Sequence, residues 1–271
     1  ISVYAQTSIT ISTESNQGKL FPKVTLDNSV FTAQIRPVAV TGVNIKDTVE
    51  HAIRNWYLKS IGQDLVLNKL LDACAQRGSA DTAFITENTL DRKTVRVIFR
   101  HILDKQYEGI SDYTVFSDRP FIKIRYEKYE YKNGWANTVD NVDNIIQVGS
   151  IFKIYGQDEY GPLEYYPGAY WDTIDSLDAL TAGALNYNKH IIMTLSNQTS
   201  GLGFCRIMPV YAANVNAGIR ILKLLNQSNK GLETFKATGG ANHKPFNAYI
   251  FMFTEGADAG IEYAKLIIDT D

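Results

Sequence analysis

The chain has 271 residues, of which 45% are apolar, so it can bury a substantial core in one large domain or in two that share a sheet. Its 27 Lys and Arg nearly balance its 29 Asp and Glu, and the net charge of -2 excludes a general attraction to nucleic acid or to an anionic membrane. No run approaches the roughly 20 apolar residues that a membrane-spanning helix needs. We therefore expect no membrane span and regard nucleic acid as a disfavoured partner.

The beginning of the chain has the pattern of β-structure. Residues 2–12 alternate apolar and polar side chains with a period of two, which is typical of a half-buried strand, and residues 16–19 form a turn signal. Further short strands are expected at 23–26, 30–35 and 38–43. We therefore predict a β-rich N-terminal arm over residues 1–45, followed by a single α+β domain over residues 46–271.

The stretch from about residue 46 to residue 105 shows the longest helical periodicity in the chain. Asp47 and Glu50 have the spacing of a capping box, and apolar residues then recur three and four positions apart. These residues are Val49, Ala52, Ile53, Trp56 and Tyr57 at the start of the stretch, and Leu90, Thr94, Val97, Ile98 and Ile102 near its end. The pattern predicts three helices that form the helical side of the core.

Strands return after this block. Residues 121–132 place Ile122 and Ile124 on one face and charged residues on the other, and an Asn-Gly turn signal follows them. In the last hundred residues, helices are expected at 172–185 and 209–225, strands at 190–195 and 249–253, and a closing helix, or a helix followed by a strand, at 257–268. We therefore predict an α+β fold with a mixed, largely antiparallel sheet, the helical block over about 46–105, and interleaved helices in the C-terminal third.

Basic residues recur at a regular spacing in the third helix predicted within the 46–105 block. Arg92, Arg96 and Arg100 lie four positions apart, as they would on a helix face that contacts phosphates. The acidic residues nearby favour a solvated, charge-balanced face instead. In the strand over residues 121–132, alternating basic and acidic residues favour a cross-strand charge ladder over a base-stacking surface.

No constellation in the sequence has the spacing of a catalytic or metal site. The four histidines show no metal-ligand spacing, and the two glycine-rich segments, 201–203 and 238–242, lack the remainder of a dinucleotide or phosphate-loop motif. Cys74 and Cys205 lie in apolar segments, which favours buried free thiols. We predict no catalytic, cofactor-binding or metal-ligating residue and no cofactor; whether the chain is an enzyme stays open, and a non-enzymatic role is favoured.

An aromatic loop is the feature of the sequence most typical of a contact surface. It holds the candidate interface residues Tyr160, Tyr165, Tyr166, Tyr170 and Trp171. Tyr and Trp combine a large contact area with a polar group, so they concentrate at protein interfaces and in sugar-stacking sites. A loop that folds back on a sheet edge would have the same composition.

Two classes of function fit these features best. The favoured one is a self-assembling structural subunit, of the kind found in viral or phage particles, whose partners are copies of itself or other assembly proteins and whose contacts are the N-terminal arm and the aromatic loop. The alternative is a secreted or surface binding protein, carbohydrate-directed or toxin-like, that uses the same loop. An enzyme without a readable motif is a third alternative. A virion or extracellular location is slightly favoured over a cytoplasmic one.

Overall fold

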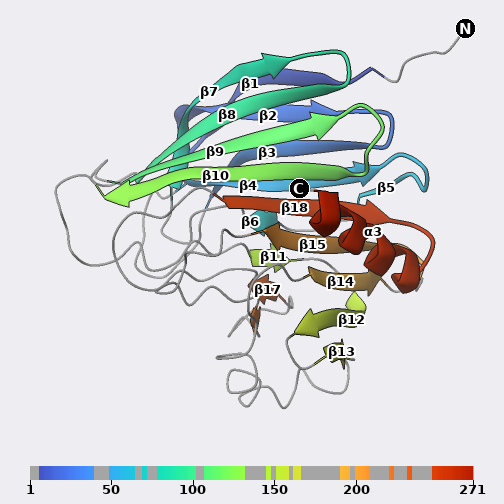
Figure 1. Ribbon diagram of the computed structural model, residues 1–271. Helices are drawn as coiled ribbons and strands as arrows, with labels where there is room; N and C mark the ends of the chain where they lie inside the picture. Colours follow the sequence, from blue (N-terminus) through green and yellow to red (C-terminus); the bar gives the residue numbers. More distant parts are fainter. Residues whose placement is uncertain are drawn as a thin grey trace, which may run out of the picture.

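The computed structural model describes residues 6–39, 49–64, 69–71, 78–101, 107–131, 145–147, 151–158, 161–165, 190–195, 199–207, 220–222, 231–233 and 246–270. In this part of the chain two antiparallel sheets lie face to face, and one helix covers part of the outer side of the second sheet (Figure 1). The fold is therefore mostly antiparallel β-structure. The predicted α+β fold, with a helical block and interleaved C-terminal helices, is wrong.

The first sheet, sheet 1, has nine strands. They are β1 (Ser8–Asn16), β2 (Lys19–Asp27), β3 (Phe31–Ala39), β4 (Val49–Leu58), β5 (Gln63–Asp64), β6 (Lys69–Leu71), β11 (Ile145–Gln147), β16 (Arg220–Leu222) and β17 (Gly231–Glu233). The spatial order is β1-β2-β3-β4-β6-β11-β17-β16, with β5 paired to β4. Consecutive strands pair at the β1 end, so the first part of the chain builds this side of the sheet as a meander.

The second sheet, sheet 2, also has nine strands. They are β7 (Gly78–Asn88), β8 (Arg92–His101), β9 (Tyr107–Phe116), β10 (Phe121–Tyr131), β12 (Ile151–Asp158), β13 (Gly161–Tyr165), β14 (His190–Leu195), β15 (Gly201–Ile207) and β18 (Phe246–Phe253). The spatial order is β13-β12-β14-β15-β18-β10-β9-β8-β7. Because β18 lies between β15 and β10, the C-terminal end of the chain reaches the middle of the sheet.

The core lies between the two sheets and is built by alternation along the strands. In β8, Val95, Val97 and Phe99 are buried while the residues between them face outward. From sheet 1, Trp56 packs against Phe31 with ring centroids 5.3 Å apart. The largest fully buried side chains between the sheets are Trp56, Tyr113, Phe31, Phe99, Leu26, Ile35 and Ile53. Both sheets therefore have one apolar face that they bury against each other.

A β-bulge explains the false helical signal at the start of the predicted helical block. His51, Ile53, Trp56 and Leu58 of β4 are buried, so the spacing between buried residues is two, then three, then two. The extra residue is Asn55, which has a φ of 56°, and the pairing of β4 with β3 shifts at this point. A bulge adds one residue to a strand, so it converts a period of two into a local spacing of three.

In β8 the ambiguity comes from a spacing of four. Arg92, Arg96 and Arg100 are four positions apart, and four residues are two pleat repeats as well as about one helical turn. The β-branched residues Thr94, Val95, Val97 and Ile98 favour the strand. Leu90, expected in a buried helical stripe, is 90% exposed in the turn between β7 and β8.

Other predicted elements are confirmed. Strands expected at 2–12, 23–26 and 30–35 correspond to β1, β2 and β3, and those expected at 121–132, 190–195 and 249–253 correspond to β10, β14 and β18. Of the separate strand expected at 38–43, the described residues continue β3. Of the helix expected over 209–225, the described residues are strand β16, while the helix expected over 172–185 lies outside the described residues. The division into an arm and a domain stays a prediction.

The closing helix expected at 257–268 is confirmed as α3 (Ala257–Thr270), which packs on the outer face of sheet 2. It covers a cluster of buried residues formed by Ile192, Cys205, Tyr249, Phe251, Phe253, Ala264 and Ile267. Cys205 is a free thiol, as expected, and burial raises its pKa well above the usual range. Cys74 lies outside the described residues. The α3 helix therefore divides the outer face of sheet 2 into a covered part and an open part.

Candidate functional site

A buried asparagine fixes the hairpin turn that forms one side of the candidate site. Asn28, between β2 and β3, donates from Nδ2 to the backbone carbonyls of Phe116 and Arg119, at 2.6 and 2.8 Å. Its Oδ1 accepts the backbone N–H groups of Val30 and Phe31, each at 2.9 Å. One side chain thus joins the β2–β3 turn of sheet 1 to the β9–β10 turn of sheet 2.

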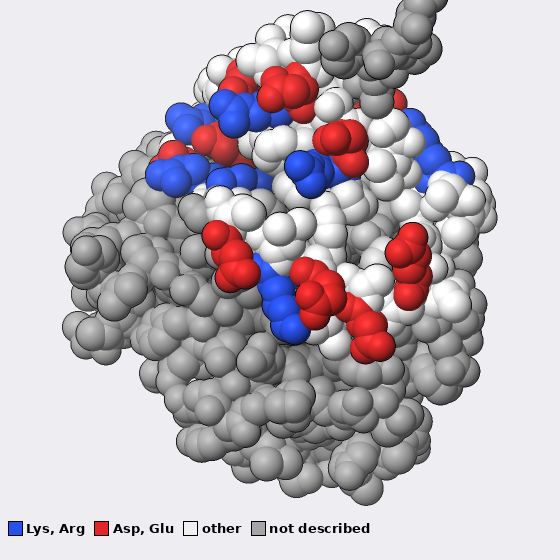
Figure 2. All heavy atoms as spheres, turned by 45° about the vertical axis from the view of Figure 1, so that its right-hand side comes forward, with Lys and Arg blue, Asp and Glu red and all other residues white. Residues whose placement is uncertain are grey.

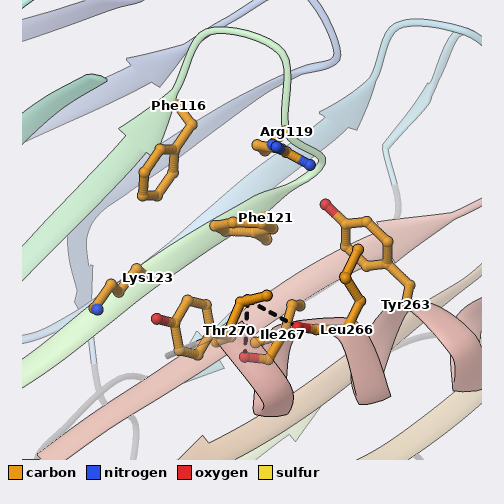
Figure 3. Close-up of a pocket in the computed structure, with 9 residues that line it drawn as sticks. Phe116, Arg119, Phe121, Lys123, Tyr263, Leu266, Ile267 and Thr270 are labelled. Atoms are coloured by element: carbon orange, nitrogen blue, oxygen red, sulfur yellow. Dashed lines mark hydrogen bonds between the residues drawn. The ribbon is translucent and has the colours of Figure 1, made fainter. Parts of the chain in front are cut away.

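A pocket of about 360 Å³ lies between this β9–β10 turn and α3 (Figure 3). Its lining residues come from β9, the turn, β10, β18 and α3, and they are Phe116, Arg119, Phe121, Lys123, Tyr249, Tyr263, Leu266, Ile267 and Thr270. The volume is within the range of small-molecule sites, and the lining combines aromatic and apolar side chains with a few polar groups. This composition is typical of a binding site.

Phe121 is the centre of the aromatic lining. Its ring makes edge contacts with Phe116 and Tyr249, at centroid distances of 5.0 and 5.4 Å, and lies 6.0 Å from the ring of Tyr263. Figure 3 shows Phe121 between Arg119 on one side and Lys123 on the other. Phe116, Phe121 and Tyr263 are half-buried, and Leu266 is 49% exposed, so solvent reaches apolar surface in the pocket.

Polar groups lie around these rings. Lys123 Nζ lies 5.3 Å from the ring centroid of Tyr249, a cation–π geometry. Burial raises the pKa of the Tyr263 hydroxyl, and the neighbouring Arg119 works against that shift. Thr270 donates its hydroxyl to the Leu266 carbonyl at 2.8 Å, so this hydroxyl is held by the last turn of α3.

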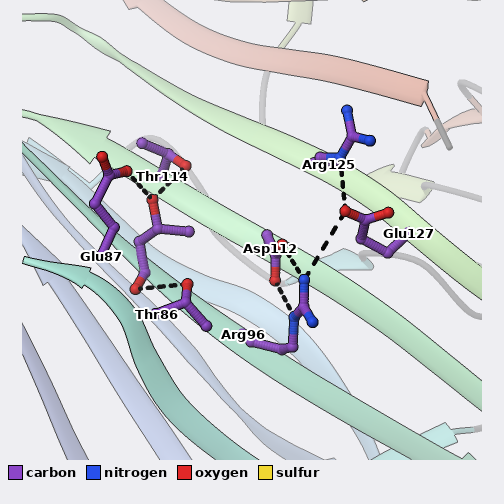
Figure 4. Close-up of polar contacts among 8 residues, drawn as sticks. Thr86, Glu87, Arg96, Asp112, Thr114, Arg125 and Glu127 are labelled. Carbon is purple, nitrogen blue, oxygen red and sulfur yellow. Dashed lines mark hydrogen bonds and ion pairs between the residues drawn. The ribbon is translucent and has the colours of Figure 1, made fainter.

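Beyond the pocket, the open part of sheet 2 carries a polar ladder. Arg96 and the buried Asp112 form two hydrogen bonds of 2.7 Å each, and these raise the pKa of the Arg96 guanidinium further above its usual value. Glu127 accepts from Arg125 at 2.8 Å, and lies 3.9 Å from Arg96 (Figure 4). Figure 2 shows acidic and basic side chains interspersed on this face. The charge-balanced reading of the basic stripe is therefore confirmed, although the stripe lies on a strand.

The aromatic loop predicted as an interface is not tested by the structure. Of its residues, Tyr165 is the last residue of β13, and Tyr160, Tyr166, Tyr170 and Trp171 lie outside the described residues. The pocket was not predicted, because its lining residues come from two distant parts of the chain. More than 120 positions separate Phe121 from Tyr249. The sequence does place Phe121 and Tyr249 on predicted strands. It does not show that these two strands are neighbours in the sheet.

Within the described ranges, no group of three or more His, Cys, Asp or Glu side chains is placed to hold a metal ion. No helix in the same part of the chain has the length and apolar character needed to cross a bilayer.

No protein-family model and no curated protein sequence matches the chain. The solved structures that resemble it include three with TM-scores below 0.5; such scores identify no shared family, substrate or activity. The galactosidase domain of AgaSK, an α-galactosidase–sucrose kinase, has a TM-score of 0.47 and 11% identity over 90% of this chain and 42% of that one. The GH36 α-galactosidase AgaB from Geobacillus stearothermophilus has a TM-score of 0.48 and 9% identity, over 90% of this chain and 41% of that one. A galactose 1-epimerase from Lactobacillus acidophilus NCFM has a TM-score of 0.49 and 8% identity, over 93% of this chain and 100% of that one. The chain thus spans about two fifths of each galactosidase chain.

Proposed function

We propose that this chain is a carbohydrate-directed binding protein and that its binding site is the pocket beside α3. The observation that carries the proposal is the cluster of rings around Phe121, which leaves half-buried aromatic surface open in a pocket of about 360 Å³. The carbohydrate-binding alternative is thereby favoured over the structural subunit, and the proposed site moves from the aromatic loop to the pocket.

A sugar fits the chemistry of this lining. A sugar ring has an apolar C–H face and a rim of hydroxyl groups, so it needs an aromatic surface with donors and acceptors at its edge. Phe121 and Tyr263 supply the aromatic surface. Arg119 and Lys123 supply donors beside it.

A glycan array probed with the full chain tests the proposal. Glycans that bind wild type should lose affinity in Phe121→Leu, which keeps apolar volume in the pocket but removes the ring face. The matched control is Phe84→Leu, because Phe84 is 42% exposed on β7 and does not line the pocket. Equal binding by both variants, or no glycan bound by wild type, would overturn the proposal.

A second candidate function, self-association, rests on a different surface. β1 and β7 are the last strands at one end of each sheet, and they pack near each other. Ile11, Leu20 and Ile85 are 36%, 73% and 42% exposed there. Ile11 pairs across the strands with the buried Val24, and Ile85 pairs with the buried Val95. Because directly paired residues face the same side of a sheet, Ile11 and Ile85 lie on the inner sides of their sheets. Exposed apolar groups beside edge strands favour pairing with another chain.

The mass in solution tests self-association over a hundredfold range of concentration. A defined multiple of the monomer mass, lost in Leu20→Lys and Ile85→Lys, would support a symmetric assembly through this edge. Lys265→Ala is the control, because Lys265 is 52% exposed on α3, which packs on β14, β15 and β18. A monomer at every concentration would exclude self-association by the chain alone.

A further inference from the structure

Carboxylates neutralise most arginines whose side chains the structure describes. Arg92, Arg96 and Arg125 each donate from Nε to a carboxylate at 2.7 to 2.8 Å. Arg100 bonds to Asp81 at 2.5 Å, and Arg36 bonds to Glu14. Ion pairing within the chain is therefore the ordinary state of its arginines.

Arg119, on the rim of the pocket, differs from these five arginines. Its nearest ion-pair partner is its own neighbour Asp118, at 3.6 Å, and both side chains are at least half exposed. The Arg119 backbone is nevertheless fixed, because its carbonyl accepts from Asn28. Arg119 therefore combines a fixed main chain with a guanidinium that is only weakly neutralised.

The pocket itself is positively charged. Arg119 and Lys123 line it, and none of its nine described lining residues is Asp or Glu. Asp118, which lies 3.6 Å from Arg119, is not among the lining residues, and neither are the exposed carboxylates of α3, Asp258, Glu262 and Asp269. This local excess of positive charge stands against a net charge of -2 for the whole chain. The pocket thus has the charge that complements an anion.

We infer that the sugar bound in this pocket is acidic, and that Arg119 binds its anionic group while Phe121 contacts its ring. This inference rests on the proposed function. The planar guanidinium donates two parallel hydrogen bonds to a carboxylate or to a sulfate, which is the geometry that lysine cannot supply. A uronic acid and a sulfated sugar share this chemistry, and the ligand is one of the two.

Two matched pairs of probes test the inference by titration calorimetry. The first pair is a trigalacturonate and its methyl ester, in which each carboxylate is replaced by a neutral ester of nearly the same shape with one added methyl group. The second is an oligosaccharide carrying galactose 6-sulfate and the same compound without sulfate. In one pair, the acidic member should bind wild type about tenfold or more tightly than the neutral member, because a charge-assisted pair is lost.

Arg119→Gln should remove this preference, so that the acidic and the neutral member of the pair bind the variant with equal affinity, while Gln keeps a hydrogen-bond donor at that position. The matched control is Arg100→Gln, which removes the same charge at the far end of β8, where Arg100 is paired with Asp81. Equal affinity of wild type for acidic and neutral probes would overturn the acidic ligand, and a preference that survives in Arg119→Gln would overturn the role of Arg119.

The result that would overturn the proposed function differs from the result that would overturn the acidic ligand. If neutral glycans bind through Phe121 and charge makes no difference, the carbohydrate site stands and its acidic ligand does not. If Phe121→Leu binds every probe as wild type does, the carbohydrate site itself is wrong, whatever the effect of Arg119→Gln.

Discussion

The Nδ1 atom of His51 in β4 accepts the backbone N–H of Ala80 in β7 at 2.8 Å, so a single hydrogen bond joins the two sheets through the core. Because Nδ1 accepts, the proton lies on Nε2, which donates to the Pro22 carbonyl at 2.9 Å. The rings of Phe21 and Phe99 make edge contacts with the imidazole at centroid distances of 5.9 and 6.5 Å. These surroundings therefore require that the His51 imidazole be neutral.

Acid should destabilise the protein through His51. Burial lowers its pKa from 6.5 to about 4, so between these values the unfolded chain binds a proton that the folded chain does not. The resulting stability is complete above pH 6.5 and is lost as the pH falls toward 4, by up to about 3 kcal/mol. Urea unfolding at pH 7.5, 5.5 and 4.5 measures it. The pH slope should be smaller in His51→Gln, and an identical slope in both proteins would contradict this role.

Asn28→Ala should destabilise the fold and loosen the pocket rim together. The variant removes four hydrogen bonds of a residue that is 1% exposed and leaves buried backbone groups without partners, so we expect a loss of about 3 kcal/mol in the free energy of unfolding. Ser29→Ala is the control, because its hydroxyl makes one exposed bond to the Ser117 carbonyl. Urea unfolding compares the two, and equal losses would refute the special role of Asn28.

Gly203→Ala should destabilise the sheet beneath α3 by about 1 to 3 kcal/mol. Gly203 pairs across the strands with Phe251, whose ring covers it, and an added Cβ would lie 2.0 Å from Phe251 Cζ. Phe251→Leu in the same chain should recover part of the loss, which a double-mutant cycle measures as a coupling energy. Additive effects of the two substitutions would show that the ring does not restrict position 203.

Strand prediction succeeded where the alternation of buried residues is regular. In β10, Ile122 and Ile124 are buried as expected, and β1 and β2 join at a turn in which Gln17 and Gly18 both have positive φ, at 50° and 75°. It failed in β4, because the bulge at Asn55 changes the phase of the pattern. A bulge depends on the partner strand, so a single sequence pattern does not reveal it.

The pocket lies beyond prediction from local patterns for a different reason. Phe121 and Tyr249 become neighbours because β18 inserts beside β10, and Lys123 pairs directly with Tyr249 across those strands. Tyr263 joins them through the packing of α3 on the same face. Pairing between distant strands is set by the whole sheet, so the residues carry no common motif that could identify the site.

Hydroxyl-radical footprinting with and without a bound glycan is the most direct test of the central claim, that the pocket beside α3 is a carbohydrate site. We expect protection of Phe116, Phe121 and Leu266, which line the pocket, and unchanged labelling of Tyr57 and Phe84, which are 43% and 42% exposed elsewhere. Protection confined to the aromatic residues between Tyr160 and Trp171, with the pocket labelled as before, would contradict it and return the binding site to the loop.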